Sequence, residues 1–459
     1  MVPVGQALGH REDRSYAAAL QTLQDRGRFG IRLGLGRTRA ILRALGDPQL
    51  GFRGALVTGT NGKGSVLALD GSALRAAGYR IGSTPKPHLV SYRERLQIDG
   101  RSVDPSTFAR LVGQVDVVAQ KVGHRLGEPT EFELLTAVVF LWFAEQGIDL
   151  ALVEVGLGGR LDATHAWDGG VAVITNVDLD HMDRLGPTIG HIAREKAAIV
   201  VRGDRAVTGA TGEALSIVRR RARRLDVPLS EVMPPPILGW DRDGLTVELP
   251  RLGPTRVGLR GRHQAANAAV ADATLDALEA AGLATVGPEA RRTGYATTVW
   301  PGRLELISVD GRDVLLDGAH NPAGAVALAV ALDDLRPSLT GGAVSPGARP
   351  PVTLLTAAMA DKDVAGVAAA LARADALRDA RIICTGLHVP RAMPADRLAA
   401  IWAAEGGDRS ILVEPEVNAA LDRALAEATG PVVVAGSLYL VGAVRARLVA
   451  DPLLRDPEE

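Results

Sequence analysis

The sequence contains few cysteines, few aromatic residues and no excess of either charge. Its one cysteine, Cys384, lies in the apolar run RIICTG, where a buried strand residue is expected, and a single cysteine excludes a disulfide within the chain. Aromatic residues make up 3% of the chain, and 52 Lys and Arg stand against 53 Asp and Glu, for a net charge of −1. Proteins that bind nucleic acid usually carry a basic excess or aromatic stacking platforms. The composition therefore argues against a nucleic-acid partner and favours a small-molecule one.

The sequence also lacks a hydrophobic run long enough to cross a membrane. The longest apolar stretch, Leu134–Ala144, is flanked by Glu133 and Glu145 and is typical of a buried helix. The first residues show no basic start followed by an apolar run, so no signal peptide is expected. Together with the single cysteine, which fits a reducing compartment, these absences predict a soluble cytoplasmic protein with no membrane partner.

The length of 459 residues exceeds one ordinary core and predicts two domains. Short β-branched runs such as GALVTGT, DLALVEVG and VAVITNVD alternate with longer helical stretches, which is typical of an α/β fold with a mostly parallel sheet. After residues 300–302 this alternation restarts in a second, smaller unit. We expect an N-terminal P-loop ATPase-like domain over residues 1–302 and a smaller, Rossmann-like α/β domain over residues 303–459.

The stretch VTGTNGKGSVL, Val57–Leu67, departs from the general phosphate-loop pattern. Val57 stands where the first glycine belongs, and Gly64 separates Lys63 from Ser65. A strand, a glycine-rich turn and a helix are nevertheless the right context for cradling phosphate, with a charge from Lys63 and a hydroxyl for Mg²⁺ from Ser65. The spacing favours a nucleotide site and leaves a structural turn as the alternative.

Three further polar residues bear on function, and for two of them a functional and a structural interpretation compete. Glu154 ends the run DLALVEVG, at a sheet edge that suits a metal or nucleotide, although a capping or salt-bridged role is the alternative. His181 follows the run VAVITN among three aspartates, which favours a ligand or ion-paired role over the usual structural one. Lys196, in IAREKAAIV, is typical of an exposed helix lysine.

The string TGTNGKGS, with its extra glycine, resembles the phosphate loop of the Mur ligase superfamily, and more closely that of the folylpolyglutamate synthase/dihydrofolate synthase family. Other strings resemble that family in its order along nearly the whole chain. They are IRLGLGRTRAILRALGDPQ, KPHLVSYRERLQIDG, EPTEFELLTA, LVEVGLGGRLDATH, DLDHMDRLGPTIGHIAREKAAIV, GRHQAANAAVA, WPGRLE, LLDGAHNPAG, MADKD and VAGSLYLVG.

The resemblance implies an ATP-dependent ligase that adds L-glutamate to a folate or dihydropteroate carboxylate through an acyl phosphate. It assigns residues 303–459 as the glutamate-ligase domain. The implied nucleotide-binding residues are Thr60, Asn61, Gly62, Lys63, Gly64, Ser65, Asn267, Arg303 and Asp317. The implied Mg²⁺ ligands are Ser65, Glu154, His181 and Lys196, the last as a carbamate. His320 joins Lys63, Glu154, His181 and Lys196 as a catalytic residue.

On the acceptor side the resemblance is looser. Thr130, Phe132, Arg160 and Asp162 match positions of the family's pterin pocket, although Phe132 also reads as a core residue. Arg391 and Ser437 lie where the second domain would meet glutamate or a substrate tail.

One position breaks the pattern. The family usually has a Mg²⁺-ligating serine directly before Pro-His, and this chain has Lys86, which cannot ligate a metal while protonated. Either Ser83 or Thr84 supplies the hydroxyl, or Lys86 partly replaces the charge of the metal. A third alternative, which we favour, is that Lys86 points at the substrate carboxylate or the γ-phosphate.

Two rival functions remain open at this point. One is a Mur-type ligase acting on another carboxylate, against which GGRLDAT and TEFE argue. The other is a non-catalytic folate- or nucleotide-binding protein, which has no use for the combined set of Lys63, Glu154, His181 and Lys196. The sequence does not separate a dihydrofolate synthase from a folylpolyglutamate synthase, and we expect a monomer.

Overall fold

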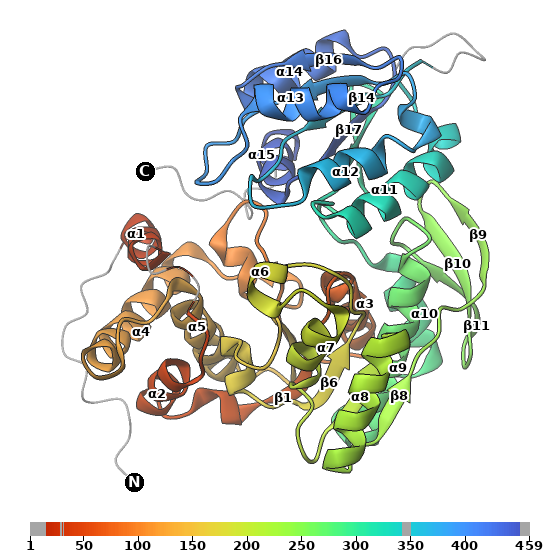
Figure 1. The fold of residues 1–459 in the computed structure, drawn as a ribbon. Helices are drawn as coiled ribbons and strands as arrows, with labels where there is room; N and C mark the ends of the chain where they lie inside the picture. Colours follow the sequence, from red (N-terminus) through yellow and green to blue (C-terminus); the bar gives the residue numbers. More distant parts are fainter. Residues whose placement is uncertain (1–14, 28–29, 31, 342–349, 450–459) are drawn as a thin grey trace.

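The structure, a computed structural model, describes residues 15–27, 30, 32–341 and 350–449 (Figure 1). The described chain forms two α/β units, one above the other in Figure 1, with a small antiparallel sheet beside them. The predicted α/β fold with a mostly parallel sheet is confirmed. The expectation about a signal peptide concerns residues outside the described part of the chain.

The larger unit is built on an eight-stranded sheet with the order β4-β3-β2-β5-β1-β6-β7-β8. Strands β2, β5, β1, β6, β7 and β8 run parallel, and the short β3 and β4 complete one edge as an antiparallel hairpin. The strands are β1 (Arg53–Thr58), β2 (Ile81–Thr84), β3 (Gln97–Ile98), β4 (Arg101–Ser102), β5 (Leu150–Glu154), β6 (Gly170–Ile174), β7 (Arg205–Thr208) and β8 (Leu229–Glu231).

Helices cover both faces of this sheet, which is why its central strands are apolar at every position. In β1, Leu56 packs into the core on one face, while Ala55 and Val57 pack into the core on the other. The first face is covered by α1 (Tyr16–Gly27), α2 (Gly36–Ala44), α4 (Pro105–Leu126), α5 (Glu131–Gln146), α7 (Ile189–Ala197) and α8 (Gly212–Leu225). The second face is covered by α3 (Lys63–Ala76), α9 (Gln264–Ala280) and α10 (Pro288–Thr297). The short α6 (Met182–Leu185) precedes α7.

The sequence analysis did not anticipate the three-stranded antiparallel sheet of β9 (Ile237–Asp241), β10 (Gly244–Leu249) and β11 (Gly253–Val257). Leu245, Val247 and Val257 bury this sheet in the core of the larger unit. Its β9–β10 turn reaches the smaller unit, where Arg242 binds Asp313 through two hydrogen bonds of 2.5 and 2.6 Å.

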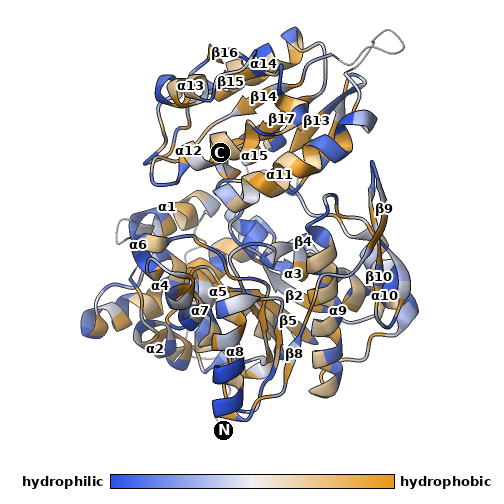
Figure 2. Cartoon of the chain, turned by 45° about the vertical axis from the view of Figure 1, so that its right-hand side comes forward, coloured by the Kyte–Doolittle hydropathy of each residue, from blue (hydrophilic) through white to orange (hydrophobic). Residues whose placement is uncertain are grey.

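The smaller unit is a six-stranded sheet with the order β12-β13-β17-β14-β15-β16, parallel except for the β12–β13 hairpin. Figure 2 shows hydrophobic residues concentrated along these strands and the helices packed against them. The strands are β12 (Glu305–Val309), β13 (Arg312–Leu316), β14 (Thr353–Thr356), β15 (Arg381–Cys384), β16 (Ser410–Val413) and β17 (Val432–Ala435). The helices are α11 (Pro322–Leu335), α12 (Val364–Leu371) and α13 (Ala395–Ala404) on one face, and α14 (Val417–Glu427) and α15 (Leu438–Leu448) on the other.

Local sequence signals account for several of these elements. The turns of both hairpins are Asp-Gly pairs with positive φ at both residues, 52° and 79° at Asp99 and Gly100 and 49° and 76° at Asp310 and Gly311. Asp104 caps α4 by accepting a hydrogen bond from a backbone N–H, as its place before Pro105 predicts. Short 3₁₀ helices lie at Pro48–Gly51, Tyr92–Arg95, Ala163–Ala166, Arg336–Ser338 and Asp375–Leu377.

Two predictions about apolar runs are confirmed. The stretch Leu134–Ala144 forms most of α5 and is almost entirely buried, and Cys384 is a buried residue of β15. Within the described residues, no helix combines the length and the apolar character that crossing a membrane requires.

Candidate active site

A cleft of about 700 Å³ lies between the two units. The larger unit contributes the carboxyl ends of β1, β5 and β6, and the smaller unit contributes the segment after β13 and the start of α11. Ligands of parallel α/β sheets bind beyond the carboxyl ends of the strands, so the cleft is where the topology predicts a binding site.

The loop between β1 and α3 forms one wall of the cleft. Lys63, the first residue of α3, donates hydrogen bonds of 3.1 Å from its amine to the carbonyl oxygens of Gly59 and Thr60. Gly62 has a φ of 81°, and a Cβ there would lie 2.2 Å from the side-chain oxygen of Asn267. The extra glycine, Gly64, also has a steric reason, because a Cβ there would lie 2.8 Å from the Trp300 ring.

Glu154 ends β5 beside this loop, and its carboxylate is 3% exposed. One carboxylate oxygen lies 4.0 Å from the Lys63 amine. Burial raises the pKa of Glu154 and lowers the pKa of Lys63, and in each case the charge of the partner opposes the shift. Each residue therefore supports the charged form of the other inside the cleft.

Lys196 lies at the end of α7 and is 4% exposed, so its interpretation as an exposed helix lysine is wrong. Its amine donates a 2.7 Å hydrogen bond to the carbonyl oxygen of Gly59 in the phosphate loop. Burial, together with the nearby charge of Lys63, lowers the pKa of Lys196 to about 7. Near neutral pH a large fraction of this amine is uncharged.

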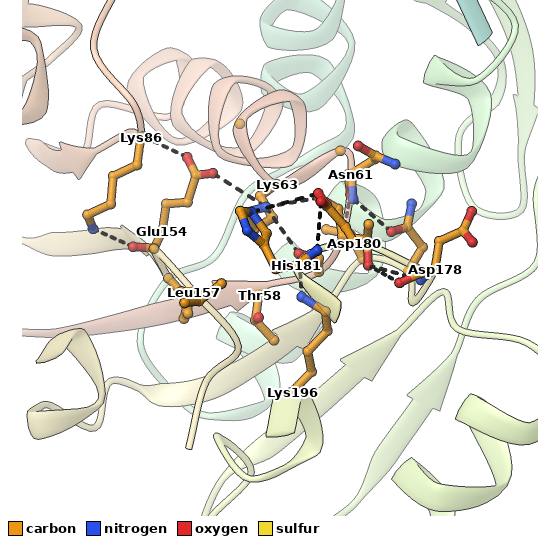
Figure 3. Close-up of a pocket in the computed structure, with 18 of the residues that line it drawn as sticks. Thr58, Asn61, Lys63, Lys86, Glu154, Leu157, Asp178, Asp180, His181 and Lys196 are labelled. Atoms are coloured by element: carbon orange, nitrogen blue, oxygen red, sulfur yellow. Dashed lines mark hydrogen bonds and ion pairs between the residues drawn. The ribbon is translucent and has the colours of Figure 1, made fainter. Parts of the chain in front are cut away.

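Side chains from both units meet at the mouth of the cleft around Asp180, which Figure 3 shows beside His181. Asp180 accepts hydrogen bonds of 3.2 Å from the amine of Lys362 and from the side-chain amide of Asn321, both in the smaller unit. Burial would raise the pKa of Asp180, but the charges of His181 and Lys362 lower it to about 2. His181 has a left-handed backbone conformation with a φ of 50°, and its Nε2 lies 3.5 Å from the Lys362 amine.

Asp180, Lys362 and Asn321 were missed by the sequence analysis, although each lies in a string that resembles the family. The sequence marks them only weakly, because neither one aspartate among several nor one lysine in a loop indicates a contact with the other unit. Among the described residues, these contacts place charged groups of both units against one another beside the phosphate loop.

The residues predicted for the nucleotide lie along the cleft. Asn267, Arg303, Asp317 and His320 all line it. Asp317 accepts 2.9 Å hydrogen bonds from the backbone N–H groups of residues 304 and 319, and burial raises its pKa against the opposing charge of Arg303. His320 accepts or donates at 2.8 Å to the carbonyl oxygen of residue 318, and burial lowers its pKa to about 4. His320 is therefore neutral at pH 7.

The acceptor-side predictions divide into two groups. Thr130, Phe132 and Asp162 line the cleft, and Thr130 also caps α5 through a reciprocal pair of hydrogen bonds with Glu133. The other three do not line it. Arg160 pairs with Glu195 at 2.9 Å, Arg391 pairs with Asp361 at 2.7 Å, and the Ser437 hydroxyl caps α15 by accepting a hydrogen bond from Tyr439.

Lys86 lies between β2 and β3, next to the end of β5. Its backbone N–H donates a 2.9 Å hydrogen bond to the Glu154 carboxylate, and its amine donates to the Glu154 carbonyl oxygen. The amine thus contacts the main chain at the end of β5, and its expected place at the substrate carboxylate or the γ-phosphate stays a prediction. Burial lowers the pKa of Lys86 to about 8. Neither Ser83 nor Thr84 lines the cleft to replace the missing hydroxyl.

The four residues predicted to hold Mg²⁺, Ser65, Glu154, His181 and Lys196, all line the cleft. In the described part of the chain, no group of three or more His, Cys, Asp or Glu side chains is placed to hold a metal ion. Mg²⁺ usually keeps several waters and binds one or two protein oxygens together with substrate phosphates. Ser65, in the first turn of α3, and Glu154 both line the cleft and fit that mode.

Lysine is rare in this chain and concentrated at the site. The chain has five lysines, which are Lys63, Lys86, Lys121, Lys196 and Lys362. Lys63, Lys86 and Lys196 line the cleft, and Lys362 contacts Asp180 at its mouth. Lys121 alone is exposed, on α4.

The fold and the site together define a Mur ligase. Residues 57–230 match the Mur ligase middle domain, and residues 302–438 match the Mur ligase glutamate ligase domain. Within that class, the chain belongs to the folylpolyglutamate synthase/dihydrofolate synthase family. It is 36% identical over 325 residues to the dihydrofolate synthase/folylpolyglutamate synthase of Bacillus subtilis, covering 69% of this chain and 75% of the relative.

A second relative is longer than this chain. The probable bifunctional folylpolyglutamate synthase/dihydropteroate synthase of Halobacterium salinarum is 36% identical over 446 residues, which cover 94% of this chain. The aligned residues span 51% of that relative, about half of its length.

Solved structures of relatives have the same fold. The Mycobacterium tuberculosis folylpolyglutamate synthase complexed with ADP and AMPPCP superposes with a TM-score of 0.83 at 30% identity, over 95% of this chain and 100% of that one. Escherichia coli FolC in complex with DHPP and ADP gives a TM-score of 0.78 at 30% identity, over 95% and 97%. The bifunctional enzyme of Yersinia pestis, complexed with AMPPNP and a Mn ion, gives 0.79 at 29% identity, over 96% and 100%.

Proposed function

We propose that this protein is an ATP-dependent ligase that joins L-glutamate to the carboxylate of a folate or of dihydropteroate through an acyl phosphate. The observation that carries the proposal is the cleft that Lys63 and Glu154 of one unit line together with Asp317 and His320 of the other. The complexes of relatives with adenine nucleotides, with DHPP and with a divalent ion support the same assignment.

A carboxylate is a poor electrophile, so it must be activated before an amine can attack it. The cleft supplies what phosphoryl transfer needs, which is positioning and positive charge rather than covalent chemistry. Lys63 and the N-terminus of α3 would bind the phosphate oxygens. His320, with its pKa lowered to about 4, would act in the cleft as a neutral hydrogen-bonding group rather than as a strong base. Enclosure of the reacting atoms between the two units would keep water from the acyl phosphate.

We propose that the divalent ion is Mg²⁺, held by Ser65 and Glu154 together with the nucleotide phosphates. When bound, Mg²⁺ supplies charge stabilisation to the transferring phosphoryl group. Lys196 would join this set as a carbamate, an anion formed when its uncharged amine adds to CO₂ and releases a proton. Its burial and its lowered pKa support this modification, because the reaction requires the uncharged amine.

The lowered pKa of Lys196 gives a pH-dependent expectation. With a pKa of about 7, the uncharged fraction of the amine is about tenfold larger at pH 8 than at pH 6. Enzyme prepared without CO₂ should therefore regain activity on adding bicarbonate readily at pH 8 and poorly at pH 6. Carbon-13 NMR with labelled bicarbonate should show a carbamate signal that is absent from Lys196→Arg. Equal recovery at both pH values without such a signal would contradict carbamylation.

The function itself is tested by phosphate release from ATP in the presence of Mg²⁺ and L-glutamate, with dihydropteroate and a reduced folate in parallel reactions. We expect release that depends on the acceptor and on glutamate, and a product heavier by one glutamate residue in the mass spectrum. The acceptor that gains the mass distinguishes a dihydrofolate synthase from a folylpolyglutamate synthase, and gain on both indicates a bifunctional enzyme. Absence of acceptor-dependent release would refute the ligase assignment.

The remaining expectations stay predictions. They are a monomer, a cytoplasmic location and a division into domains at residues 302 and 303. Light scattering of the purified protein tests the first of them.

A further inference from the structure

Lys86 stands where this family usually has serine, and its backbone does not explain the change. The main-chain N–H of Lys86 donates to the Glu154 carboxylate, a contact that any residue other than proline could make. Parallel pairing of β2 with β5 brings residue 86 beside Glu154 whatever its side chain, because Thr84 already pairs with Val153. What the lysine adds at this position is its side chain, which ends in the amine.

The amine lies on the side of Glu154 away from the nucleotide loop. It donates to the Glu154 carbonyl oxygen, while the Glu154 carboxylate faces Lys63 at 4.0 Å. Figure 3 shows the Lys86 amine at the main-chain carbonyl of Glu154, and the Lys63 amine near the carboxylate of the same residue. A phosphate or metal bound at Lys63 would thus be separated from the Lys86 amine by the glutamate itself.

The amine lies beside residues that match positions of the family's pterin pocket. The Lys86 nitrogen lies 5.4 Å from the centre of the Phe132 ring, and Phe132 and Asp162 line the cleft beside it. The Asp162 carboxylate is already occupied by the backbone N–H groups of Leu157 and Thr164. An ammonium group has three N–H bonds, and within the described residues one of them is used, by the Glu154 carbonyl. The other two remain to serve a bound molecule.

We propose that Lys86 is a specificity-determining residue that donates hydrogen bonds to the acceptor, recognising a planar heteroaromatic ring with nitrogen or oxygen acceptors held against Phe132. This inference rests on the proposed function, since the acceptor is then the ring portion of a folate or of dihydropteroate. According to this proposal Lys86 takes no part in metal binding. Replacing it therefore changes the affinity for the acceptor and leaves the affinities for the nucleotide and Mg²⁺ unchanged.

The test compares the wild-type protein with Lys86→Met, which keeps the length of the side chain and removes the donors, and with Lys86→Ser, which introduces the residue usual in the family. Lys121→Met is the matched control, because Lys121 is exposed on α4 and is not among the residues that line the cleft. Steady-state assays give the KM for the acceptor, the KM for ATP, the half-saturating Mg²⁺ concentration and kcat. Titration of dihydropteroate and of a reduced folate without ATP gives acceptor binding independently of turnover.

We expect the acceptor KM and dissociation constant of Lys86→Met to rise by about tenfold to a hundredfold, the range for a lost hydrogen bond to a charged group. Lys86→Ser should show a similar rise, because a serine hydroxyl is too short to reach the same atoms. The KM for ATP and the Mg²⁺ requirement should stay within about twofold of wild type, and Lys121→Met should match wild type throughout.

Other outcomes would overturn the inference. Unchanged acceptor binding in both variants would mean that Lys86 only stabilises the position of Glu154. A change confined to the Mg²⁺ requirement, the KM for ATP or kcat would mean that Lys86 acts on metal or nucleotide binding. If Lys86→Met unfolds in a thermal melt, Lys86→Ser decides by the same criteria. A wild-type protein that binds the acceptor but releases no phosphate refutes the proposed ligase while leaving the role of Lys86 measurable by titration. Wild-type protein that binds neither acceptor overturns both.

Discussion

Replacing Glu154 with glutamine is expected to lower kcat by about a hundredfold to a thousandfold, the range seen when one electrostatic contact to a transition state is lost. Glutamine keeps the shape of the side chain and can still accept the hydrogen bond from the Lys86 N–H. What disappears is the negative charge 4.0 Å from the Lys63 amine and the proposed ligand of Mg²⁺.

The same substitution should change the pH profile in a defined direction. Burial lowers the pKa of Lys63, and Glu154 is the largest influence opposing that shift. Without the carboxylate the pKa of Lys63 falls further, so the protonated form is lost at a lower pH and the alkaline limb of the kcat profile moves to lower pH. Glu145→Gln, at a partly exposed ion pair with Arg110, is the control and should behave as wild type. A Glu154→Gln enzyme with kcat within threefold of wild type would rule out this role.

Replacing Arg291 with methionine is expected to destabilise the fold by about 3 to 5 kcal/mol, the cost of leaving a buried charge without its partner. Arg291 on α10 donates a 2.9 Å hydrogen bond to Asp272 on α9, and the two side chains are 5% and 7% exposed. Asp272 also accepts a 3.2 Å hydrogen bond from the hydroxyl of Tyr295. The pair lies behind α3, where a Cβ on Gly294 would already collide with the Ala73 backbone at 2.4 Å, so α10 has no room to shift.

Urea denaturation followed by circular dichroism measures this loss. Arg220→Met, at an exposed position of α8, is the matched control and should stay within about 0.5 kcal/mol of wild type. The double variant Arg291→Met with Asp272→Asn should recover part of the loss, because no unpaired charge is then buried. A single variant as stable as the control would show that water or Tyr295 compensates Asp272 fully.

Much of the fold followed from local sequence patterns. Continuous apolar runs such as DLALVEVG became central parallel strands, and the Asp-Gly pairs at 99–100 and 310–311 became tight hairpin turns. The antiparallel sheet of β9 to β11 was not predicted, because β9 is largely exposed and lacks the apolar run that marks a buried strand. The position of this sheet depends on packing against core residues that are distant in sequence, and local sequence patterns carry no information about such packing.

The site was predicted best where one strand or loop supplies the chemistry. Lys63, Glu154 and Asn267 all line the cleft beside the phosphate loop, and the glycine spacing that looked irregular reflects contacts with Trp300 and Asn267. Prediction failed where tertiary contacts decide. The burial of Lys196 and the crossing of Lys362 to Asp180 depend on residues far away in sequence.

The distribution of lysine has a consequence for chemical labelling. Four of the five lysines lie in or against the cleft, and arginine supplies nearly all the positive charge elsewhere. Amine-reactive dyes and cross-linkers, which on most proteins scatter over the surface, would here find one exposed lysine at position 121 apart from the α-amine of the chain. A reagent small enough to enter the cleft would meet amines of lowered pKa at Lys86 and Lys196, of which a larger fraction is uncharged near neutral pH than for an ordinary lysine. Amine labelling of the surface should therefore be nearly specific for one lysine, and a bound substrate would protect the lysines of the cleft from a small reagent.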